Sequence, residues 1–374
     1  MKTFYKILAF KIEAYDYFLF KEDLKNNFKD YLLIKFNPHS ITKVVIDTKN
    51  KSNRAGFYFS SNYIRNRMIY YIFYPIIFII DFIKIFFYLK SVCSKKEFEY
   101  FFTDNTYTCV AFILLSFNKK VKIIYASHDW LAGTSGKGIW SKIGKNVIFV
   151  FFDYIACRFS YLVLNHTEIL QKKRNEYWKH NIFNQKIYYP NIKLNKKDTN
   201  LNNKKKRNII FLGLVRDESG LPDVIKVISK YDSKIKLKIV GTINKKTNIL
   251  IKNNKLEKIV NIAGFQERKN FESFFQDCFC GLCLVVNDSS YTNNTIPSKI
   301  IDYLQYGIPI IATSNLGYTS NLIKENKIGI IIDKDLKDLE YAINNLYKNF
   351  QTYNNSIKMF FNGYNKTDIK EIFK

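Results

Sequence analysis

Residues 294–315 read NTIPSKIIDYLQYGIPIIATSN, and this stretch decides how the second half of the chain folds. Pro297 suits the first turn of a helix, and Gly307 suits the position just past its end. One apolar face of that helix would pack on a sheet through Ile300, Ile301 and Leu304. The run that follows, IPIIAT, is short and apolar, so it predicts a buried strand.

The same alternation of strand and helix continues on both sides of this stretch. Six apolar runs follow residue 207: NIIFLG (208–213), IKLKIVG (235–241), IVNIAG (259–264), GLCLVV (281–286), IPIIAT (308–313) and IGIIID (328–333). Helical patterns separate them, which favours parallel pairing through right-handed crossovers. A shorter alternation precedes them, with strands at 121–127 and 161–165. The sequence therefore predicts an α/β protein with doubly wound parallel sheets.

A solvated linker divides the chain. Residues 192–207 read IKLNKKDTNLNNKKKR and offer almost nothing to bury. We expect an N-terminal domain over 1–191, then this linker, a C-terminal domain over 208–350 and a helical tail over 351–374.

The composition describes a globular and strongly basic protein. Apolar residues make up 47% of the 374, and 33 Phe and 27 Tyr exclude general disorder. The formal net charge is +27, which attracts polyanions such as phosphates, nucleic acid or anionic lipid. No helix-turn-helix, zinc-finger or RNA-binding aromatic motif is present, so nucleic acid is not the expected partner.

Residues 69–89, IYYIFYPIIFIIDFIKIFFYL, are the most apolar and aromatic stretch. Pro75, Asp81 and Lys84 interrupt the run of about twenty apolar residues that a membrane span needs. Three interpretations stay open: a buried helix, a helix lying in the membrane interface with its basic neighbours on lipid phosphates, and a spanning helix.

The cysteines and the N-terminus favour a reducing, cytoplasmic compartment. Three of the six cysteines lie in CFCGLC (278–283), an apolar run that predicts a packed strand rather than a metal site. The first residues carry charges where a signal peptide would have its apolar core.

The helix in the opening stretch also carries groups that can bind a nucleotide. Ser298 and Lys299 lie at its N-terminus, where backbone N–H groups, the helix dipole and an ammonium can hold a diphosphate. Asp302, one turn deeper, could accept hydrogen bonds from a ribose diol. The alternative is a capped surface helix with an exposed Lys299–Asp302 pair.

The order and wording of these segments resemble glycosyltransferases of the GT-B fold, which have two facing Rossmann-like domains, and especially the family-4-like or group 1 members. The resemblance covers roughly residues 205–345, through NIIFLG, KIVG, NIAGF, PSKIIDYLQYGIPIIATSN and IGIII. It implies that Ser298 and Lys299 contact the donor diphosphate and that Asp302 holds the ribose. Gly264 and Phe265 would lie beside the base.

Two positions depart from the family. Its retaining members have two glutamates separated by seven residues, where this chain has Asn294 and Asp302. Those members also place an arginine and a lysine after the first strand of this domain. Here Arg216 is the nearby cation and the expected substitute, with a solvated loop arginine as the alternative.

His128 and Asp129 close the strand at 121–127, where a base or a sugar-contacting group of the first domain would lie. In an inverting reaction a carboxylate takes the proton of the attacking hydroxyl, and Asp129 is the candidate. The alternative for Asp129 is capping of the helix that follows. His128 could contact the donor sugar.

The predicted function is transfer of a sugar from a nucleotide-diphosphate sugar to a lipid-linked or polysaccharide acceptor at the inner face of the cell membrane. No cofactor and no metal are expected, because Lys299 and helix N–H groups would stabilise the leaving diphosphate and no Asp-x-Asp triplet is present. The alternatives are a nucleotide-sugar 2-epimerase of the same fold and a non-enzymatic protein that binds anionic membranes or nucleic acid.

Overall fold

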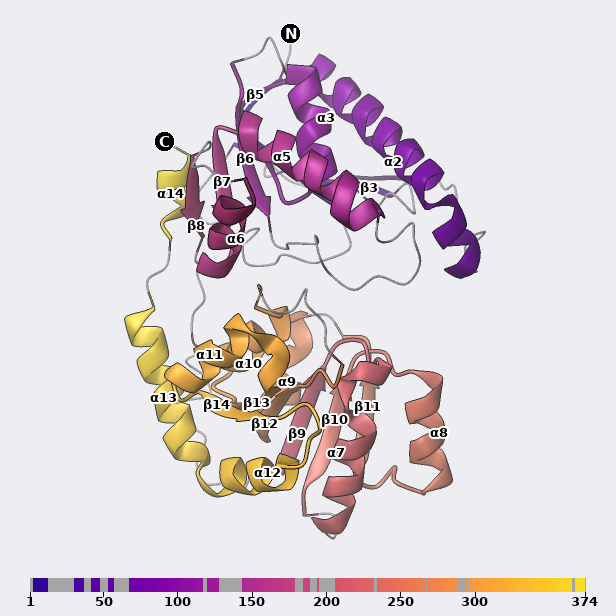
Figure 1. Ribbon diagram of the computed structural model, residues 1–374, viewed down its shortest axis with the longest axis vertical. Coiled ribbons are helices and arrows are strands. Elements are labelled where there is room, and N and C mark those ends of the chain that lie inside the picture. The colour runs from indigo at the N-terminus through magenta and orange to yellow at the C-terminus, as the bar shows by residue number, and fades with distance from the viewer. Residues whose placement is uncertain are drawn as a thin grey trace. The chain divides into compact units, whose positions relative to one another are not determined.

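The computed structural model of the chain forms two compact units (Figure 1). One comprises Met1–Asn191 with Lys366–Lys374, and the other Ile192–Asn365. The structure describes residues 3–12, 30–36, 42–47, 53–56, 67–116, 120–127, 143–178, 184–188, 194, 206–231, 234–266, 268–287, 294, 296–364 and 367–373.

The first unit is built on an eight-stranded sheet, in the order β4-β3-β2-β1-β5-β6-β7-β8 over the described residues. Its strands are β1 (Thr3–Ile12), β2 (Tyr31–Phe36), β3 (Thr42–Asp47), β4 (Asn53–Gly56), β5 (Lys96–Thr103), β6 (Lys122–Ser127), β7 (Leu162–Asn165) and β8 (Gln185–Ile187). The strands from β2 to β8 in this order pair in parallel. β3 and β4 add an antiparallel edge, which the predicted parallel alternation did not include.

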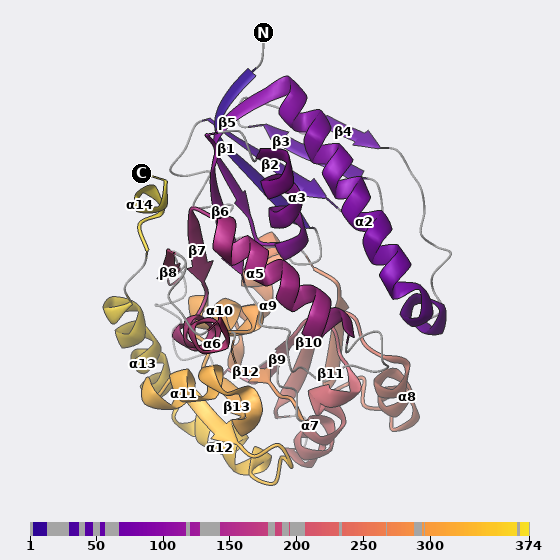
Figure 2. The same ribbon diagram turned by 45° about the horizontal axis from the view of Figure 1, so that its top comes forward.

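Helices cover the sheet of the first unit. α2 (Arg67–Lys95), α3 (Thr106–Ser116) and α5 (Phe149–Phe159) lie together on one face, as Figure 2 shows. A further helix of this unit, α6 (Glu168–Trp178), precedes β8. Side chains alternate along β5, so that Phe101 packs toward these helices and Tyr100 toward the other face.

The C-terminal tail returns to the first unit. α13 (Phe350–Gly363) counts with the second unit, whereas the short α14 (Ile369–Ile372) packs on the sheet of the first. The Phe373 ring meets Tyr100 edge-on, with centroids 5.3 Å apart. The tail therefore divides between the two units instead of forming a single helical appendage.

Residues 69–89 lie in the helix α2, which has one buried face and one exposed face. Ile85, Leu89, Val92 and Cys93 are buried against the sheet, while Ile83 and Phe87 are 46% and 60% exposed. Within the described parts of the chain, no helix combines the length and the apolar character needed to cross a bilayer. The spanning interpretation is wrong for α2, because charged residues interrupt it and one of its faces belongs to the core.

The second unit is a six-stranded parallel sheet with the order β11-β10-β9-β12-β13-β14. Its strands are β9 (Asn208–Leu212), β10 (Lys236–Val240), β11 (Val260–Gly264), β12 (Cys278–Cys283), β13 (Ile310–Thr313) and β14 (Gly329–Ile332). Its helices are α7 (Leu221–Ile228), α8 (Lys245–Asn253), α9 (Phe271–Phe275), α10 (Ser298–Gln305), α11 (Tyr318–Glu325), α12 (Leu339–Lys348) and α13. The strand order reverses between β9 and β12, which makes this the switch point where doubly wound sheets bind ligands.

Alternating side chains on the strands account for helices on both faces of the second sheet. On β9, Ile209 and Phe211 pack with α7, α8 and α12, whereas Ile210 and Leu212 pack with α9, α10, α11 and α13. The predicted doubly wound fold is confirmed. Cys278, Cys280 and Cys283 are buried free thiols on β12, as the apolar run predicted.

Candidate functional site

Three strands of the second unit end in glycine at the same edge of the sheet. Gly213 follows β9, Gly241 follows β10 and Gly264 closes β11. A Cβ at Gly241 would lie 1.9 Å from the Gly213 carbonyl oxygen, so only glycine permits this backbone approach. Gly264 has φ of +67° and open space beside it. This edge therefore lacks side-chain bulk where a ligand would approach.

α10 begins at this edge and forms as its sequence predicts. Gly307, with φ of +65°, donates its N–H to Leu304, and Ile308 donates to Tyr303, which is the Schellman arrangement that ends a helix. Pro297 lies just before the first helical residue rather than inside the first turn. The sheet-facing residues Ile300, Ile301 and Leu304 are buried, as expected.

Tyr303 fixes α10 to the two strands that separate at the switch point. Its hydroxyl accepts a hydrogen bond from the Leu212 N–H at 3.0 Å and donates one to the Leu282 carbonyl at 3.1 Å. Leu212 and Leu282 lie beyond the last positions at which β9 and β12 pair with each other. The buried phenol thus satisfies backbone groups that the diverging strands leave unpaired, and it positions the helix N-terminus above the gap.

Two of the predicted donor-binding residues lie at that N-terminus. Lys299 is half-buried, and its Nζ lies 4.5 Å from the ring centroid of Phe211 on β9. Ser298 is exposed. The ammonium and the start of the helix are thus placed at the carboxyl end of β9, an arrangement that can hold an anion. Asn294, another predicted donor-binding residue, is 2% exposed.

Asp302 differs from its expected setting. Only 7% of the residue is exposed, and its partner is Arg268 on the 3₁₀ turn η6 (Arg268–Asn270), not Lys299. Burial raises the pKa of Asp302 to about 6, although the Arg268 guanidinium acts to lower it. The alternative of an exposed Lys299–Asp302 surface pair is wrong, because the helix turns Asp302 toward η6.

The remaining donor-side predictions lie around the same edge. Phe265, directly after β11, is 81% exposed and offers an uncovered ring beside Gly264. Arg216 follows β9 in the loop before the 3₁₀ turn η4 (Asp217–Ser219); its guanidinium is exposed, 3.6 Å from the Glu218 carboxylate. The structure brings Lys299, Phe265 and Arg216 to one edge of one sheet. The roles of these residues remain predictions.

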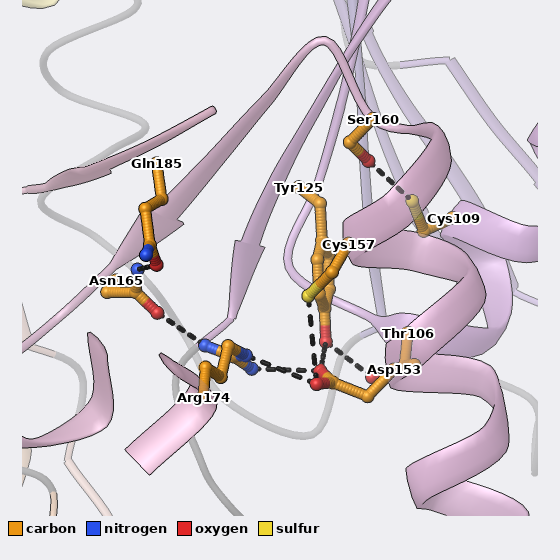
Figure 3. A network of polar contacts seen from close by, with 9 residues as sticks. All are labelled: Thr106, Cys109, Tyr125, Asp153, Cys157, Ser160, Asn165, Arg174 and Gln185. Carbon is orange, nitrogen blue, oxygen red and sulfur yellow. Dashed lines mark hydrogen bonds and ion pairs between the residues drawn. The ribbon is translucent and has the colours of Figure 1, made fainter. Parts of the chain in front are cut away.

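The predicted catalytic residues of the first unit, His128 and Asp129, lie outside the described residues. The strand that leads to them, β6, is described through Ser127 and pairs with β7 so that Ser127 lies opposite Asn165. Below these strand ends is a buried polar network (Figure 3). Arg174 on α6 and Asp153 on α5, both fully buried, form its ion pair at 2.9 Å.

This network binds five elements of the first unit together. Arg174 donates through Nε and Nη2 to the two carboxylate oxygens of Asp153, and through Nη1 to Asn165 at the end of β7. Tyr125 of β6 donates its hydroxyl proton to Asp153 at 2.9 Å, so the Thr106 hydroxyl, 2.7 Å away, is the donor to Tyr125. Burial by itself would lower the pKa of Arg174, but Asp153 outweighs it and the net shift is upward.

The sequence did not predict the roles of four residues: Arg268, Tyr303, Asp153 and Arg174. Arg268 stands in the charged run ERK, which begins three residues after the strand-ending Gly264, a position that could have drawn attention to it. Tyr303 is the single polar group on the sheet-facing side of α10 and carries no other signal. Asp153 and Arg174 lie 21 residues apart on separate helices, and only the fold brings them together. Among the described residues no cluster of three or more metal-ligating side chains occurs.

Residues 192–366 match the family described as glycosyl transferases group 1. The C-terminal half of the chain is a glycosyl transferases group 1 domain. This match covers the unit that carries Lys299 and Asp302, and the chain as a whole has the GT-B fold. No curated protein matches the sequence of the chain significantly.

Solved structures resemble the chain over nearly its whole length. Anabaena Alr3699/HepE, in complex with UDP and glucose, aligns with a TM-score of 0.62 at 14% identity, over 94% of this chain and 92% of that one. Sucrose-phosphate synthase from Thermosynechococcus elongatus gives 0.64 at 10% identity, over 95% of both chains. The lipopolysaccharide outer core galactosyltransferase WaaB gives 0.55 at 12% identity, also over 95% of both chains. At these identities the likeness establishes the fold.

Proposed function

We propose that this glycosyltransferase takes a nucleotide-diphosphate sugar as donor and binds its diphosphate at the N-terminus of α10. The observation that carries the proposal is the position of Lys299 at the switch point between β9 and β12, with the Asp302 carboxylate one turn deeper. The structure of Anabaena HepE in complex with UDP and glucose, which shares the fold, supports this class of donor.

In the proposed reaction the acceptor hydroxyl attacks the anomeric carbon and the nucleoside diphosphate leaves. Lys299 and the N–H groups of the first turn stabilise the charge that develops on the leaving diphosphate, so a metal ion is not required for that task. In the inverting form of the reaction Asp129 takes the proton of the attacking hydroxyl. Phe265 stacks beside the base and Asp302 accepts hydrogen bonds from the ribose.

The donor proposal is tested by Lys299→Ala, with Lys324→Ala as a matched control. Lys324 is an exposed lysine on α11 and has no part in the proposed site. Loss of a charged hydrogen bond to phosphate should weaken nucleotide binding by about one to two decades, since such bonds contribute roughly 1.5–3 kcal/mol. Calorimetric titration with UDP, ADP and GDP measures the nucleotide affinity of each protein. Unchanged affinity in a folded Lys299→Ala protein would remove the assignment.

We propose further that the acceptor is a lipid-linked or growing polysaccharide chain at the inner face of the cell membrane. The outer surface of the first unit supports this. α2 exposes Ile79, Ile80, Ile83 and Phe87, and the neighbouring α5 exposes Phe151 and Phe159. These two helices touch through Phe82 and Phe152, with ring centroids 5.4 Å apart.

Basic side chains accompany this apolar surface. Lys90, Lys95 and Arg158 are exposed on the same two helices, and Lys84 is half-exposed beside Asp81. Apolar and aromatic groups flanked by cations are the composition that binds an anionic bilayer surface. WaaB, a lipopolysaccharide outer core galactosyltransferase with the same fold, is compatible with an acceptor of this kind.

Vesicle binding tests the membrane proposal. The protein should co-sediment with phosphatidylglycerol vesicles, less so as salt rises and much less with phosphatidylcholine vesicles. Phe87→Glu should weaken binding at low salt, whereas Met359→Glu, a matched change at a 72% exposed residue of α13, should not. Equal binding of both variants, or no binding of the wild-type protein, would exclude this surface.

A further inference from the structure

A charged contact links the proposed base side of the donor site to the proposed ribose side. Arg268 opens η6, three residues after Phe265, while Asp302 lies on α10. Arg268 Nη2 donates to Asp302 Oδ2 at 3.2 Å. The side chains are 24% and 10% exposed, so both charges are largely withdrawn from water. Such a pair is held more firmly than a surface ion pair.

The contact leaves half of the carboxylate available. Among the described residues Arg268 is the hydrogen-bond partner of Asp302, and the bond uses Oδ2. Oδ1 is left to accept a hydrogen bond from a ligand. A carboxylate that keeps its charge accepts a hydroxyl proton more strongly than a neutral carboxyl does.

Burial and the charge of Arg268 have opposite effects on the ionisation of Asp302. Burial is the largest influence on this carboxyl and favours the neutral form; the charge of Arg268 and its hydrogen bond favour the ionised form. Lys299 lies one turn earlier on the same helix, and the Tyr303 phenol is the adjacent titratable group. Of these groups, Arg268 is the one in direct contact with the carboxylate.

We propose that Arg268 is a positioning residue of the donor site, which holds Asp302 through Oδ2 and thereby presents Oδ1 to the ribose hydroxyls. This inference rests on the proposed function, because it assumes that Asp302 accepts from the ribose. Arg268 thus controls how well the site recognises a ribonucleotide, although it does not touch the diphosphate.

The test compares UDP binding from pH 5 to 9 in the wild-type protein, Arg268→Met and Arg268→Lys. Wild-type affinity should rise with pH as Asp302 ionises, with a midpoint at about 6. In Arg268→Met the midpoint should move up by at least about one pH unit, because a carboxyl that loses an adjacent arginine becomes harder to ionise. Arg268→Lys should bring the pH midpoint most of the way back to the wild-type value. Arg207→Met, an exposed arginine at the opposite end of β9, is the control.

A second measurement isolates the ribose contact. Wild-type protein should prefer UDP over its 2′-deoxy analogue, and Arg268→Met should lose most of that preference. In the Asp302→Asn background Arg268→Met should have no further effect, since both substitutions remove one interaction.

The outcomes separate this inference from the function on which it rests. Wild-type protein that binds none of UDP, ADP and GDP overturns the donor proposal and this inference with it. Tight UDP binding with the same pH midpoint and the same ribose preference in Arg268→Met overturns only the role of Arg268.

Discussion

The ring of Tyr303 occupies the space that any side chain at Gly281 would need. A Cβ on Gly281 would lie 2.5 Å from Cγ of Tyr303, with the neighbouring ring carbons at 2.6 and 2.8 Å. The glycine in the middle of β12 therefore lets the phenol cross the strand and reach Leu212 and Leu282. The position of the proposed diphosphate site depends on this contact, because Tyr303 and Lys299 share α10.

Gly281→Ala should destabilise the protein by about 1–3 kcal/mol, the usual cost of forcing one extra carbon into a packed core. Chemical denaturation followed by circular dichroism measures it. Gly363→Ala is the control, because a Cβ there meets nothing within 4 Å. Equal stability of the two variants would show that Tyr303 can shift without penalty.

Tyr303→Phe should also cost about 1–3 kcal/mol, but for another reason. The ring remains, while the Leu212 N–H and the Leu282 carbonyl lose their partner in a buried place. Tyr341→Phe, at a tyrosine that is 65% exposed, should change stability by less than about 0.5 kcal/mol. Denaturation midpoints of the two variants provide the comparison. A neutral Tyr303→Phe would mean that water replaces the hydroxyl.

The raised pKa of Asp302 predicts a pH-dependent loss of stability. Burial raises this pKa to about 6 from the ordinary value of 3.8, so the folded protein holds the proton more tightly than the unfolded chain. The resulting stabilisation is fully present below about pH 4 and is lost as the pH rises to about 6.

Asp302→Asn should therefore equal the wild-type protein in stability near pH 4 and exceed it at pH 7. Urea denaturation at several pH values checks this. Asp223→Asn, at an exposed aspartate paired with Lys226, should show no comparable trend. A variant less stable than wild type at pH 7 would show that the ion pair with Arg268 outweighs burial.

Asp153→Asn should lower the stability of the first unit by about 3–5 kcal/mol, because it leaves the Arg174 guanidinium buried without a counter-charge. The double variant Asp153→Leu, Arg174→Met should lose less than the single one, since no buried charge then remains. Thermal melting shows which of the two variants is the more stable. The reverse order would mean that the hydrogen bonds to Tyr125 and Asn165 matter more than the charge.

Asp129→Asn should reduce turnover at least about 100-fold and leave nucleotide affinity nearly unchanged, since general bases typically contribute about 10²–10⁴-fold. Asparagine caps helices nearly as well as aspartate, so a capping role predicts that activity survives. Turnover and melting temperature are measured on the same preparation. Near-normal turnover would assign Asp129 to structure and leave the base unidentified.

The fold could be predicted because its signals are local. Apolar runs such as NIIFLG, with a glycine after each of the first strands, place β9 to β14 in the correct sequence of strands and helices. Gly307 alone predicts the end of α10, since the left-handed conformation there suits glycine. The antiparallel edge formed by β3 and β4 was missed, because its short segments carry no comparable apolar pattern.

The sequence by itself determined the doubly wound domain and the helix that carries Ser298, Lys299 and Asp302, because chain-local spacing of glycine, proline and apolar residues specifies them. The tertiary structure alone decided the surroundings of that helix. Arg268 meets Asp302 across 34 residues of chain, and Tyr303 joins two strands that part at the switch point. Such pairings depend on how separate elements pack, and packing brings together residues whose sequence positions carry no mutual signal.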